Sequence, residues 1–436
     1  MKFYDRTREL EILSENRELA LESSRFTVVY GRRRVGKTAL ILESMKDIKG
    51  LYLFISRKNE ALLCAEFQQE IEAVLGLRIY GAVLRFRDLF EQLLMHSEKE
   101  SFTLVLDEFQ EFERVNPSVF GEMQDLWDRH KAQSRLNLIV CGSAYSLMTK
   151  IFEDQKEPLF GRLTSKITLR PFSPSVIREI LSDHNPAWKP EDILCLYMLS
   201  GGSPQYIHWL LDVGANDAER MLQAVASTGS PFISEGKDLL ISEFGKEYGT
   251  YFSILQLIAS GKTSQSEIDS VIGKNTGAYL QTLEQTYTLI TRNRPMFSNP
   301  RSRNIKWKIH DQWLRFWFRF IYPRQALIET RRFDLLLEFI RRDYAQFSGQ
   351  TLEQYFRDKL AEEERITRIG GYWDSKGMNE IDIVALNELD HSALIVEVKR
   401  NPQRIDLVKL RAKAEKLTPN LEGYKVEYRA LSLDDV

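Results

Sequence analysis

The chain has 436 residues, more than one hydrophobic core usually holds, so three or four domains are expected. Apolar residues make up 43% and charged residues 28%, as in an ordinary soluble globular protein. The formal net charge is −2, which excludes a chain that is a polycation throughout. Any surface for nucleic acid must therefore be local.

Cysteine spacing and apolar runs narrow the class of protein further. Cys64, Cys141 and Cys195 lie far apart and form no CxxC pair, which argues against a zinc site or a disulfide framework and fits a reducing compartment. No apolar run approaches the roughly 18 residues of a membrane span, and the start MKFYDRTREL is too charged for a signal peptide. We expect a cytoplasmic protein with no membrane partner.

The first third of the chain alternates short apolar strands with helical patterns, which predicts a multidomain α/β protein that begins with a parallel sheet. The predicted buried strands are residues 26–30, 51–55, 102–106 and 136–141. The predicted domains are an ATPase core (1–170), a helical lid (171–245), a winged helix (246–325), a linker helix (326–344) and a final α/β domain (345–436).

Residues 31–38, GRRRVGKT, have the spacing of a phosphate-binding loop between a predicted strand and a predicted helix. The two glycines let backbone N–H groups curl around phosphates, and the N-terminus of the helix adds positive potential. Lys37 is expected to reach the β- and γ-phosphates of ATP, and Thr38 to ligate Mg²⁺. The residues predicted to bind nucleotide here are Gly31, Arg32, Arg33, Arg34, Val35, Gly36, Lys37, Thr38 and Ala39.

Polar residues after two later strands complete the expected nucleotide site. In FTLVLDEF, Asp107 is placed to hold the magnesium ion and Glu108 to polarise the attacking water. Ser143, in NLIVCGSAY, is expected either to contact the γ-phosphate or the water, or simply to cap its strand. Arg162, in PLFGRL, is either an arginine finger, which would favour a homo-oligomer if it acts in trans, or a surface ion pair.

These segments, together with FYDRTREL near the start and GGSP at 201–204, resemble the archaeal and bacterial ATPase family related to AAA+ and STAND proteins. The resemblance implies that Arg6 and Glu9 lie near the adenine. It also implies a winged helix after the ATPase region.

Residues 250–310 have the pattern of three helices followed by a β-wing, and the segment from 287 to 324 is strongly basic. Its local charge of about +8 indicates phosphate-backbone binding. The alternative is an internal role as a clamp on the nucleotide. The residues predicted to bind DNA are Gln281, Arg301, Arg303, Lys306 and Lys308 in this domain, with Lys409 and Lys413 in the last helix.

The C-terminal segments NEIDIVAL and ALIVEVK predict a hairpin that carries charged groups on mostly apolar strands. Glu397 and Lys399 share one strand face, and Asp382 is expected beside Glu397. Glu353 points with the apolar stripe of the preceding helix. Burying such charges is costly without a purpose or a metal.

This pattern resembles the PD-(D/E)xK restriction-endonuclease-like superfamily, although Ile381 stands where the usual proline would be. The resemblance implies that Asp382 and Glu397 bind Mg²⁺, with Glu353 assisting and Lys399 activating water or offsetting phosphate charge. The leading hypothesis is an ATP-driven protein that binds and cleaves DNA. The alternatives are a nucleotide-switched regulatory protein with an inert nuclease-like tail, and a toxin or defence nuclease restrained by its ATPase.

Overall fold

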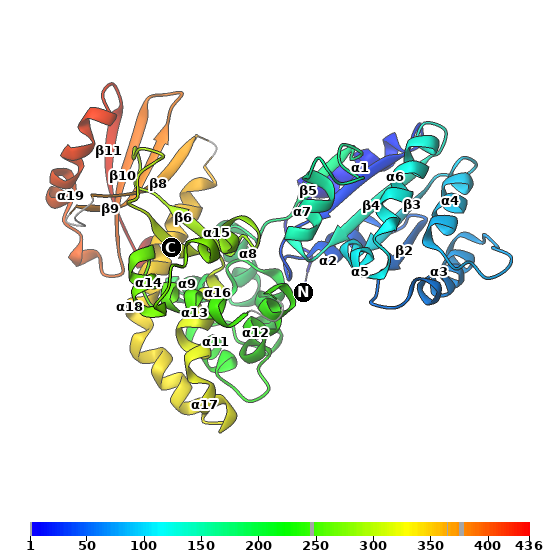
Figure 1. Ribbon diagram of the computed structural model, residues 1–436. Helices are drawn as coiled ribbons and strands as arrows, with labels where there is room; N and C mark the ends of the chain where they lie inside the picture. The colour runs from blue at the N-terminus through cyan, green and yellow to red at the C-terminus, as the bar shows by residue number, and fades with distance from the viewer. Residues whose placement is uncertain (1, 245–247, 364, 375–378) are drawn as a thin grey trace. The chain divides into compact units, whose positions relative to one another are not determined.

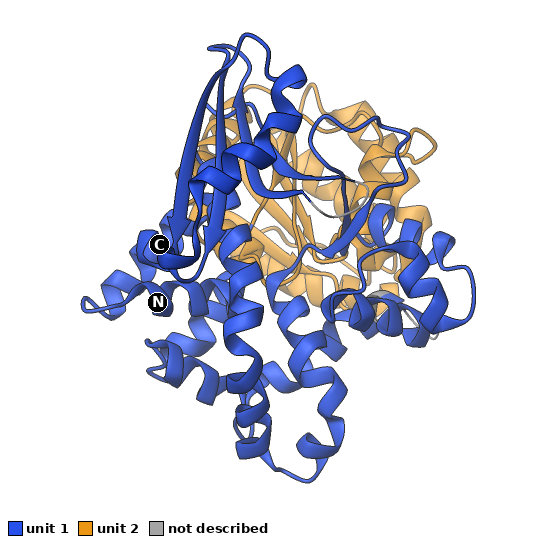
Figure 2. Ribbon diagram, turned by 90° about the vertical axis from the view of Figure 1, so that its left-hand side faces the viewer, with its two compact units in different colours: residues 1–4, 171–436 blue, residues 5–170 orange. Residues whose placement is uncertain are grey.

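The computed structural model describes residues 2–244, 248–363, 365–374 and 379–436. The chain divides into two compact units, shown in Figure 2: unit 2 comprises residues 5–170, and unit 1 comprises residues 1–4 and 171–436. The predicted boundary between lid and winged helix, at 245 and 246, lies outside the described residues. No helix in the described part of the chain is long and apolar enough to cross a membrane.

Unit 2 is built on a five-stranded parallel sheet in the order β2-β3-β4-β1-β5 (Figure 1). The strands are β1 (Arg25–Tyr30), β2 (Gly50–Phe54), β3 (Phe102–Asp107), β4 (Leu136–Gly142) and β5 (Ser165–Thr168). The predicted parallel α/β core is confirmed. β5 was not predicted, because only Ile167 of its four residues is buried and the apolar run is therefore too short to recognise.

The first helix of unit 2 precedes β1, and the others lie between successive strands. These helices are α1 (Thr7–Leu19), α2 (Lys37–Ser44), α3 (Glu60–Leu75), α4 (Phe86–Ser97), α5 (Phe112–Val115), α6 (Ser118–His130) and α7 (Tyr145–Glu153), with a 3₁₀ turn η1 (Phe109–Glu111). Residues of α3, α4, α6 and α7 share one core with the sheet. In that core the rings of Trp127 and Phe26 lie 5.1 Å apart.

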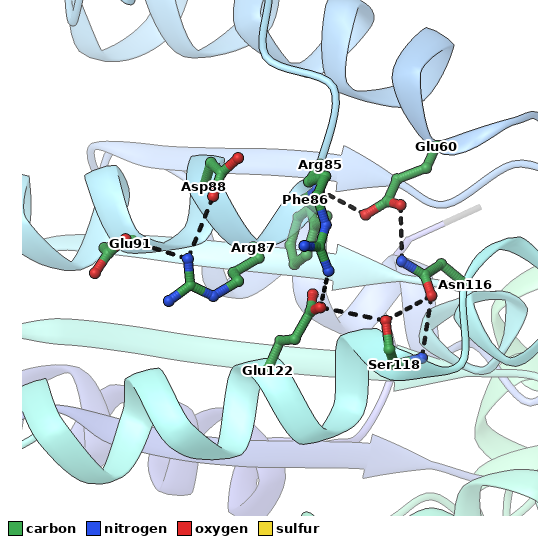
Figure 3. Close-up of polar contacts among 9 residues, drawn as sticks. All are labelled: Glu60, Arg85, Phe86, Arg87, Asp88, Glu91, Asn116, Ser118 and Glu122. Carbon is green, nitrogen blue, oxygen red and sulfur yellow. Dashed lines mark hydrogen bonds and ion pairs between the residues drawn. The ribbon is translucent and has the colours of Figure 1, made fainter.

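A polar network joins the beginnings of three of these helices (Figure 3). Glu60 accepts hydrogen bonds from the backbone N–H of Phe86 and from the side chain of Asn116, each at 2.8 Å. Arg85 pairs with Glu122, which also accepts from Ser118 at 3.3 Å. Because α4 and α6 each lead into the amino end of a strand, their beginnings lie toward the carboxyl edge of the sheet, where the phosphate-binding loop is also located.

The first part of unit 1 is helical. It contains α8 (Pro174–His184), α9 (Pro190–Ser200), α10 (Pro204–Asp212), α11 (Ala218–Val225) and α12 (Pro231–Phe244). The segment expected to be a winged helix follows with α13 (Tyr248–Ala259), α14 (Gln265–Ile272), α15 (Gly277–Gln285) and the antiparallel hairpin β6 (Ile290–Asn293) and β7 (Lys306–Ile309). The winged-helix interpretation stays a prediction.

An aromatic segment and a long helix lead to the last domain. The segment consists of α16 (Gln312–Phe316), the π-helical turn η3 (Trp317–Ile321), the 3₁₀ turn η4 (Tyr322–Arg324) and α17 (Gln325–Glu329). The helix α18 then runs from Phe333 to Ala361 without interruption. The predicted boundary at 344 and 345 therefore falls inside one helix, and no separate linker helix ends there.

The last domain has a four-stranded sheet in the order β11-β10-β9-β8. Its elements are β8 (Arg368–Trp373), β9 (Glu380–Asn387), β10 (Ser392–Lys399), η5 (Pro402–Arg404), α19 (Leu407–Ala414), η6 (Glu415–Asn420), β11 (Lys425–Ser432) and η7 (Leu433–Asp435). β8, β9 and β10 are antiparallel, whereas β10 and β11 are parallel. The hairpin predicted from the sequence is formed by β9 and β10.

Gly236 of α12 tests the packing of unit 1. A methyl group at this position would lie 2.3 Å from the indole ring of Trp317, so the ring must shift. We predict that Gly236→Ala lowers the free energy of unfolding by roughly 1–3 kcal/mol, as overpacking of a core does. The measurement is urea unfolding followed by circular dichroism.

Gly249 of α13 provides the matched control, because a methyl group there would have nothing within 4 Å. Gly249→Ala should leave stability unchanged or raise it slightly, since alanine favours a helix more than glycine does. Equal destabilisation by both substitutions would contradict the packing explanation.

Candidate functional site

The phosphate-binding loop occupies the turn between β1 and α2. Gly31 is required by close packing, because a methyl group there would lie 2.5 Å from the carbonyl oxygen of Leu169. Arg34 and Gly36 have φ angles of 72° and 93°, in the left-handed region. The backbone thus curls directly into the N-terminus of α2, as the sequence predicts. Arg33, Thr38 and Ala39 are exposed, and Arg32 and Arg34 are half-buried.

Lys37 is the first residue of α2 and is buried. Its ammonium group donates to the carbonyl oxygens of Gly31 at 2.9 Å and Arg32 at 3.0 Å. Burial lowers the pKa of Lys37, while nearby acidic groups, among them Glu108 and Asp107, oppose this effect. The structure therefore places a buried cation within the loop and close to the two predicted carboxylates.

Asp107, at the end of β3, is fixed by contacts to both of its carboxylate oxygens. Oδ1 accepts from the thiol of Cys141 and from the backbone N–H of Glu108, each at 2.8 Å. Oδ2 accepts from the Tyr52 hydroxyl and lies 3.4 Å from the Thr38 hydroxyl. The predicted pair of magnesium ligands, Thr38 and Asp107, is thus brought together.

Tyr52 and Cys141 are contacts of Asp107 that the sequence analysis missed. Both lie on strands next to β3, and burial raises the pKa of both groups. The sequence does place both residues near the carboxyl ends of predicted strands. It does not show that β2 and β4 are the two neighbours of β3, which is what brings these residues to Asp107.

Glu108 and Ser143 also meet at this edge of the sheet. The Ser143 hydroxyl donates to Glu108 Oε2 at 2.8 Å, and its backbone N–H does so at 3.3 Å. Glu108 has a φ of 54°, and its carboxylate also accepts from Gln110. The structure therefore brings Ser143 to Glu108, and its contact with the γ-phosphate or the water stays a prediction.

The buried guanidinium of Arg6 links the start of unit 2 to the phosphate-binding loop. It donates to the carbonyl oxygens of Arg170 at 2.6 Å and Val35 at 3.5 Å, and it pairs with Glu9 at 3.4 Å. Burial lowers the pKa of Arg6. The structure therefore places Arg6 and Glu9 beside the loop, and contact with an adenine remains a prediction.

Arg162 lies at the opposite edge of the sheet from the phosphate-binding loop. It precedes β5, and Thr164 nearby donates its N–H to Phe26, at the amino end of β1. Its guanidinium pairs with Asp128 at 3.1 Å and donates to the Phe160 carbonyl at 2.7 Å. Arg162 is therefore no finger for the phosphates of its own chain, and only a role in trans stays open as a prediction.

The second cluster, here called the carboxylate site, comprises Asp382, Glu397, Lys399 and Glu353. Asp382 Oδ2 accepts from the backbone N–H of Val398 at 2.7 Å and from the Lys399 ammonium at 3.1 Å. Lys399 lies 3.4 Å from Glu397 Oε1. The predicted convergence of Asp382 on β9 with Glu397 and Lys399 on β10 is present.

One carboxylate oxygen of this cluster has no partner among the residues that the structure describes. Glu397 is 9% exposed, and its buried Oε2 atom accepts no hydrogen bond. Its Oε1 atom faces Lys399 and lies 3.6 Å from Lys413 of α19. An unsatisfied buried carboxylate oxygen is costly and is a feature that a bound cation would relieve, so the residues present fit a divalent metal.

The number of acidic ligands is small. Among the residues that the structure describes, no three side chains of His, Cys, Asp or Glu converge at metal-binding spacing. The candidate metal ligands are therefore the two carboxylates Asp382 and Glu397. Mg²⁺ accepts such a set because it usually keeps several waters and needs only one or two protein carboxylates.

Glu353 of α18 faces the same cluster. Burial and the charge of Asp382 raise the pKa of Glu353 to about 7. Burial and the cations Arg315 and Arg357 lower the pKa of Lys308 to about 7. Glu353 thus lies near charged groups of both signs, which are the carboxylate of Asp382 and the cations Lys308, Lys399 and Arg357.

The structure corrects the predicted DNA-binding surface. Lys308 donates to Gln354 of α18 at 2.5 Å, and Lys306 pairs with Glu380 at 2.8 Å and lies over the Trp373 ring. The basic residues of 287–324 with partners inside the protein are Arg292, Lys306, Lys308, Arg315, Arg319 and Arg324. Counting charges along the sequence overestimated this surface, because Lys308, Arg315 and Arg319 have partners on α18 and Lys306 has one in the last domain.

Other predicted DNA contacts do face solvent. Arg301 and Arg303, between β6 and β7, are exposed, as is Gln281 of α15. Lys409 of α19 is exposed and pairs with Asp406 at 3.2 Å, whereas Lys413 points to Glu397. Gln281 donates to Gln285 at 3.0 Å across one exposed helix turn.

Two family models and one relative match parts of this chain. Residues 3–210 match a family model described as an ATPase domain predominantly from Archaea. Residues 317–415 match a model for archaeal and bacterial proteins of unknown function. The chain is 28% identical to an uncharacterised protein of Methanocaldococcus jannaschii over 406 residues. This match covers 91% of this chain and 87% of that protein.

Similarity to one solved structure with a TM-score above 0.5 supports the fold alone. A Walker-type ATPase of Pyrococcus abyssi is similar with a TM-score of 0.54 and 20% identity, covering 72% of this chain and 96% of that one. The ORC2 protein of Aeropyrum pernix is similar with a TM-score of 0.45 and 16% identity, covering 78% and 96%.

For the loop, we predict that Lys37→Ala abolishes ATP hydrolysis while the fold is kept. The substitution removes the cation that would contact the β- and γ-phosphates. Phosphate release measures hydrolysis, and circular dichroism checks the fold. Lys46→Ala is the control, because Lys46 lies just beyond α2 and is 65% exposed. Hydrolysis that survives Lys37→Ala would show that the loop assignment is wrong.

For Glu353, we predict that Glu353→Gln raises the melting temperature at pH 8 but hardly at pH 5, both in chelator. The pKa of Glu353 is about 7 in the folded chain and 4.5 is its ordinary value, so the contribution of Glu353 to the free energy of unfolding is complete below pH 4.5. This contribution is lost as the pH rises through 7. The amide avoids that loss, which amounts to roughly 3 kcal/mol as an upper bound.

Glu338→Gln, at an exposed position of the same helix, is the control and should give no pH-dependent difference. The burial explanation fails if Glu353→Gln changes the melting temperature equally at both pH values.

Proposed function

We propose that this chain couples ATP hydrolysis to binding and metal-dependent cleavage of DNA, and the match of residues 3–210 to a model of an ATPase domain predominantly from Archaea supports the ATPase half. The observation that carries the cleavage half is the carboxylate site. It places two carboxylates and a lysine together, and the buried Oε2 atom of Glu397 accepts no hydrogen bond from the described residues.

The topology of the last domain supports the restriction-endonuclease-like interpretation. A helix, three antiparallel strands, a helix and a strand parallel to β10 follow one another along the chain. Asp382 and Glu397 lie on the two central strands of that sheet, and Glu353 lies on the helix that packs against them. This is the arrangement that the resemblance of the sequence implies.

Three residues of the carboxylate site, Asp382, Glu397 and Lys399, take a direct part in cleavage in this proposal. Asp382 and Glu397 hold the metal, and Val398 N–H and Lys399 keep Asp382 in place. A bound divalent cation supplies a Lewis acid and activates water for phosphodiester hydrolysis. The pKa of Lys399 is raised because Asp382 and Glu397 outweigh the effect of burial, so Lys399 stays cationic and offsets charge on a phosphate.

The ATPase half uses the residues at the carboxyl edge of the unit 2 sheet. Loop N–H groups and Lys37 bind the phosphates, and Thr38 with Asp107 holds Mg²⁺. Glu108 orients the attacking water, and Ser143 positions the Glu108 carboxylate through its 2.8 Å hydrogen bond. Burial of Asp107 and its four contacts keeps this carboxylate in one orientation.

DNA contact is assigned to the exposed basic groups that remain after correction. Arg301 and Arg303 follow β6, and Lys409 lies on α19, the helix whose Lys413 faces Glu397. These residues would bind phosphates, whereas Gln281 is the candidate for contact with a base edge. A homo-oligomer with Arg162 acting in trans is compatible with this assignment.

A second candidate function is favoured by the small number of acidic ligands. Among the described residues no three side chains of His, Cys, Asp or Glu converge at metal-binding spacing, and Asp382 already pairs with Lys399. A nucleotide-switched DNA-binding protein with an inert tail would be built in this way. Its discriminator is Mg²⁺ or Mn²⁺ affinity, which Asp382→Ala would leave unchanged.

The test is cleavage of labelled linear, single-stranded and branched DNA with Mg²⁺ or Mn²⁺, with and without ATP. We predict cutting by the wild-type chain and at least a hundredfold loss in Asp382→Ala, because a metal ligand is removed. Asp390→Ala, in the turn after β9, is the control and should cut normally. Absence of cutting on every substrate would favour the second candidate.

A further inference from the structure

We propose that Glu191, in helix α9, is a positioning residue of the carboxylate site, acting through Arg400. This inference rests on the proposed function of that site. α9 lies inside the region that matches the ATPase family model, whereas Arg400 directly follows Lys399 at the end of β10. A helix of the region that matches the ATPase model would thereby hold the end of β10, the strand that carries Glu397, in position.

The contact between the two residues is a fork. One guanidinium nitrogen of Arg400 lies 2.5 Å from Glu191 Oε2, and the other donates to Oε1 at 3.2 Å. Paired N–H···O bonds of this kind fix direction as well as distance. Both side chains are at least two-thirds buried, so solvent weakens this pair less than one on the surface.

α18 closes the arrangement from a third side. Tyr344 donates its hydroxyl to Glu191 at 2.6 Å, and burial raises the pKa of that phenol well above its usual value, which keeps it a donor. Ser348 accepts from Arg400 at 2.7 Å. The residue after Lys399 is thus held by α9 and α18 together, and the Lys399 backbone has little freedom to move.

A second tie joins α9 to the helix that carries Glu353. The buried Tyr197 hydroxyl contacts Asp358, which accepts from Gln354 at 2.6 Å, and Gln354 accepts in turn from Lys308. Gln354 is the neighbour of Glu353. α9 therefore supports both the strand and the helix that furnish the carboxylate site.

A comparable ion pair elsewhere in unit 1 lacks this connection. Glu219 of α11 pairs with Arg341 of α18, but both are about half exposed. Arg341 lies 12 residues before Glu353 in the same helix, which corresponds to roughly 18 Å. This pair provides the matched control, since it also joins the helical segment to α18.

The experiment is calorimetric titration of the full chain with Mn²⁺, accompanied by melting curves. Glu191→Gln should weaken Mn²⁺ binding about tenfold, the lower end of the range for groups that support metal ligands. Arg400→Glu should weaken it similarly, and the double variant Glu191→Arg with Arg400→Glu should recover most of the affinity. Glu219→Gln should bind Mn²⁺ as the wild type does.

The outcomes separate this inference from the proposed function. Mn²⁺ binding by wild type that Asp382→Ala abolishes but Glu191→Gln leaves unchanged would overturn the inference alone. A folded double variant that recovers no affinity would also overturn it. Mn²⁺ binding that is equal in wild type and Asp382→Ala would overturn the metal site, and the inference with it.

Discussion

Unit 1 depends on the burial of helix α18. Leu336, Ile340, Leu352 and Phe356 place its apolar side in the core shared by the helical segment and the last sheet. The polar residues on adjoining turns consequently have little access to water and must find partners within the protein. Gln350, Gln354 and Asp358 do so through α16, β7 and α9. One helix thus sets both the packing of the unit and the electrostatics of its carboxylate site.

The two candidate sites solve the same physical problem in similar ways. Asp107 is the last residue of β3, and Asp382 lies within β9. Each carboxylate accepts hydrogen bonds from a backbone N–H and from side-chain donors. Fixing a carboxylate in this way removes the entropy that it would lose on binding a cation. The carboxylate oxygens are therefore preorganised for a ligand, and packing of the surrounding core holds them in that geometry.

Sequence patterns predicted the site residues that lie close together in the chain. They did not predict contacts between segments that only the fold brings together. The glycine spacing of residues 31–38 and the alternation around Asp382 and Glu397 were enough to predict both clusters, together with the parallel core. The basic run was misread because pairing of Lys308 with Gln354 depends on the packing of β7 against α18. Arg162 was placed by motif order alone, which cannot show the edge of a sheet on which a residue lies. Glu191 and Arg400 gave no signal, since 209 positions separate them.

The distribution of tryptophan gives the two units different optical properties. Trp127, buried against Phe26, is the sole indole among residues 5–170, while the other six of the chain's seven tryptophans are in residues 171–436. Intrinsic emission therefore reports mainly on unit 1, where Trp313 and Trp317 are fully buried. Far-ultraviolet dichroism instead weights both units by their helical content. If the units unfold separately, the two signals will follow different denaturation curves, and emission from a chain that lacks Trp127 will isolate unit 1.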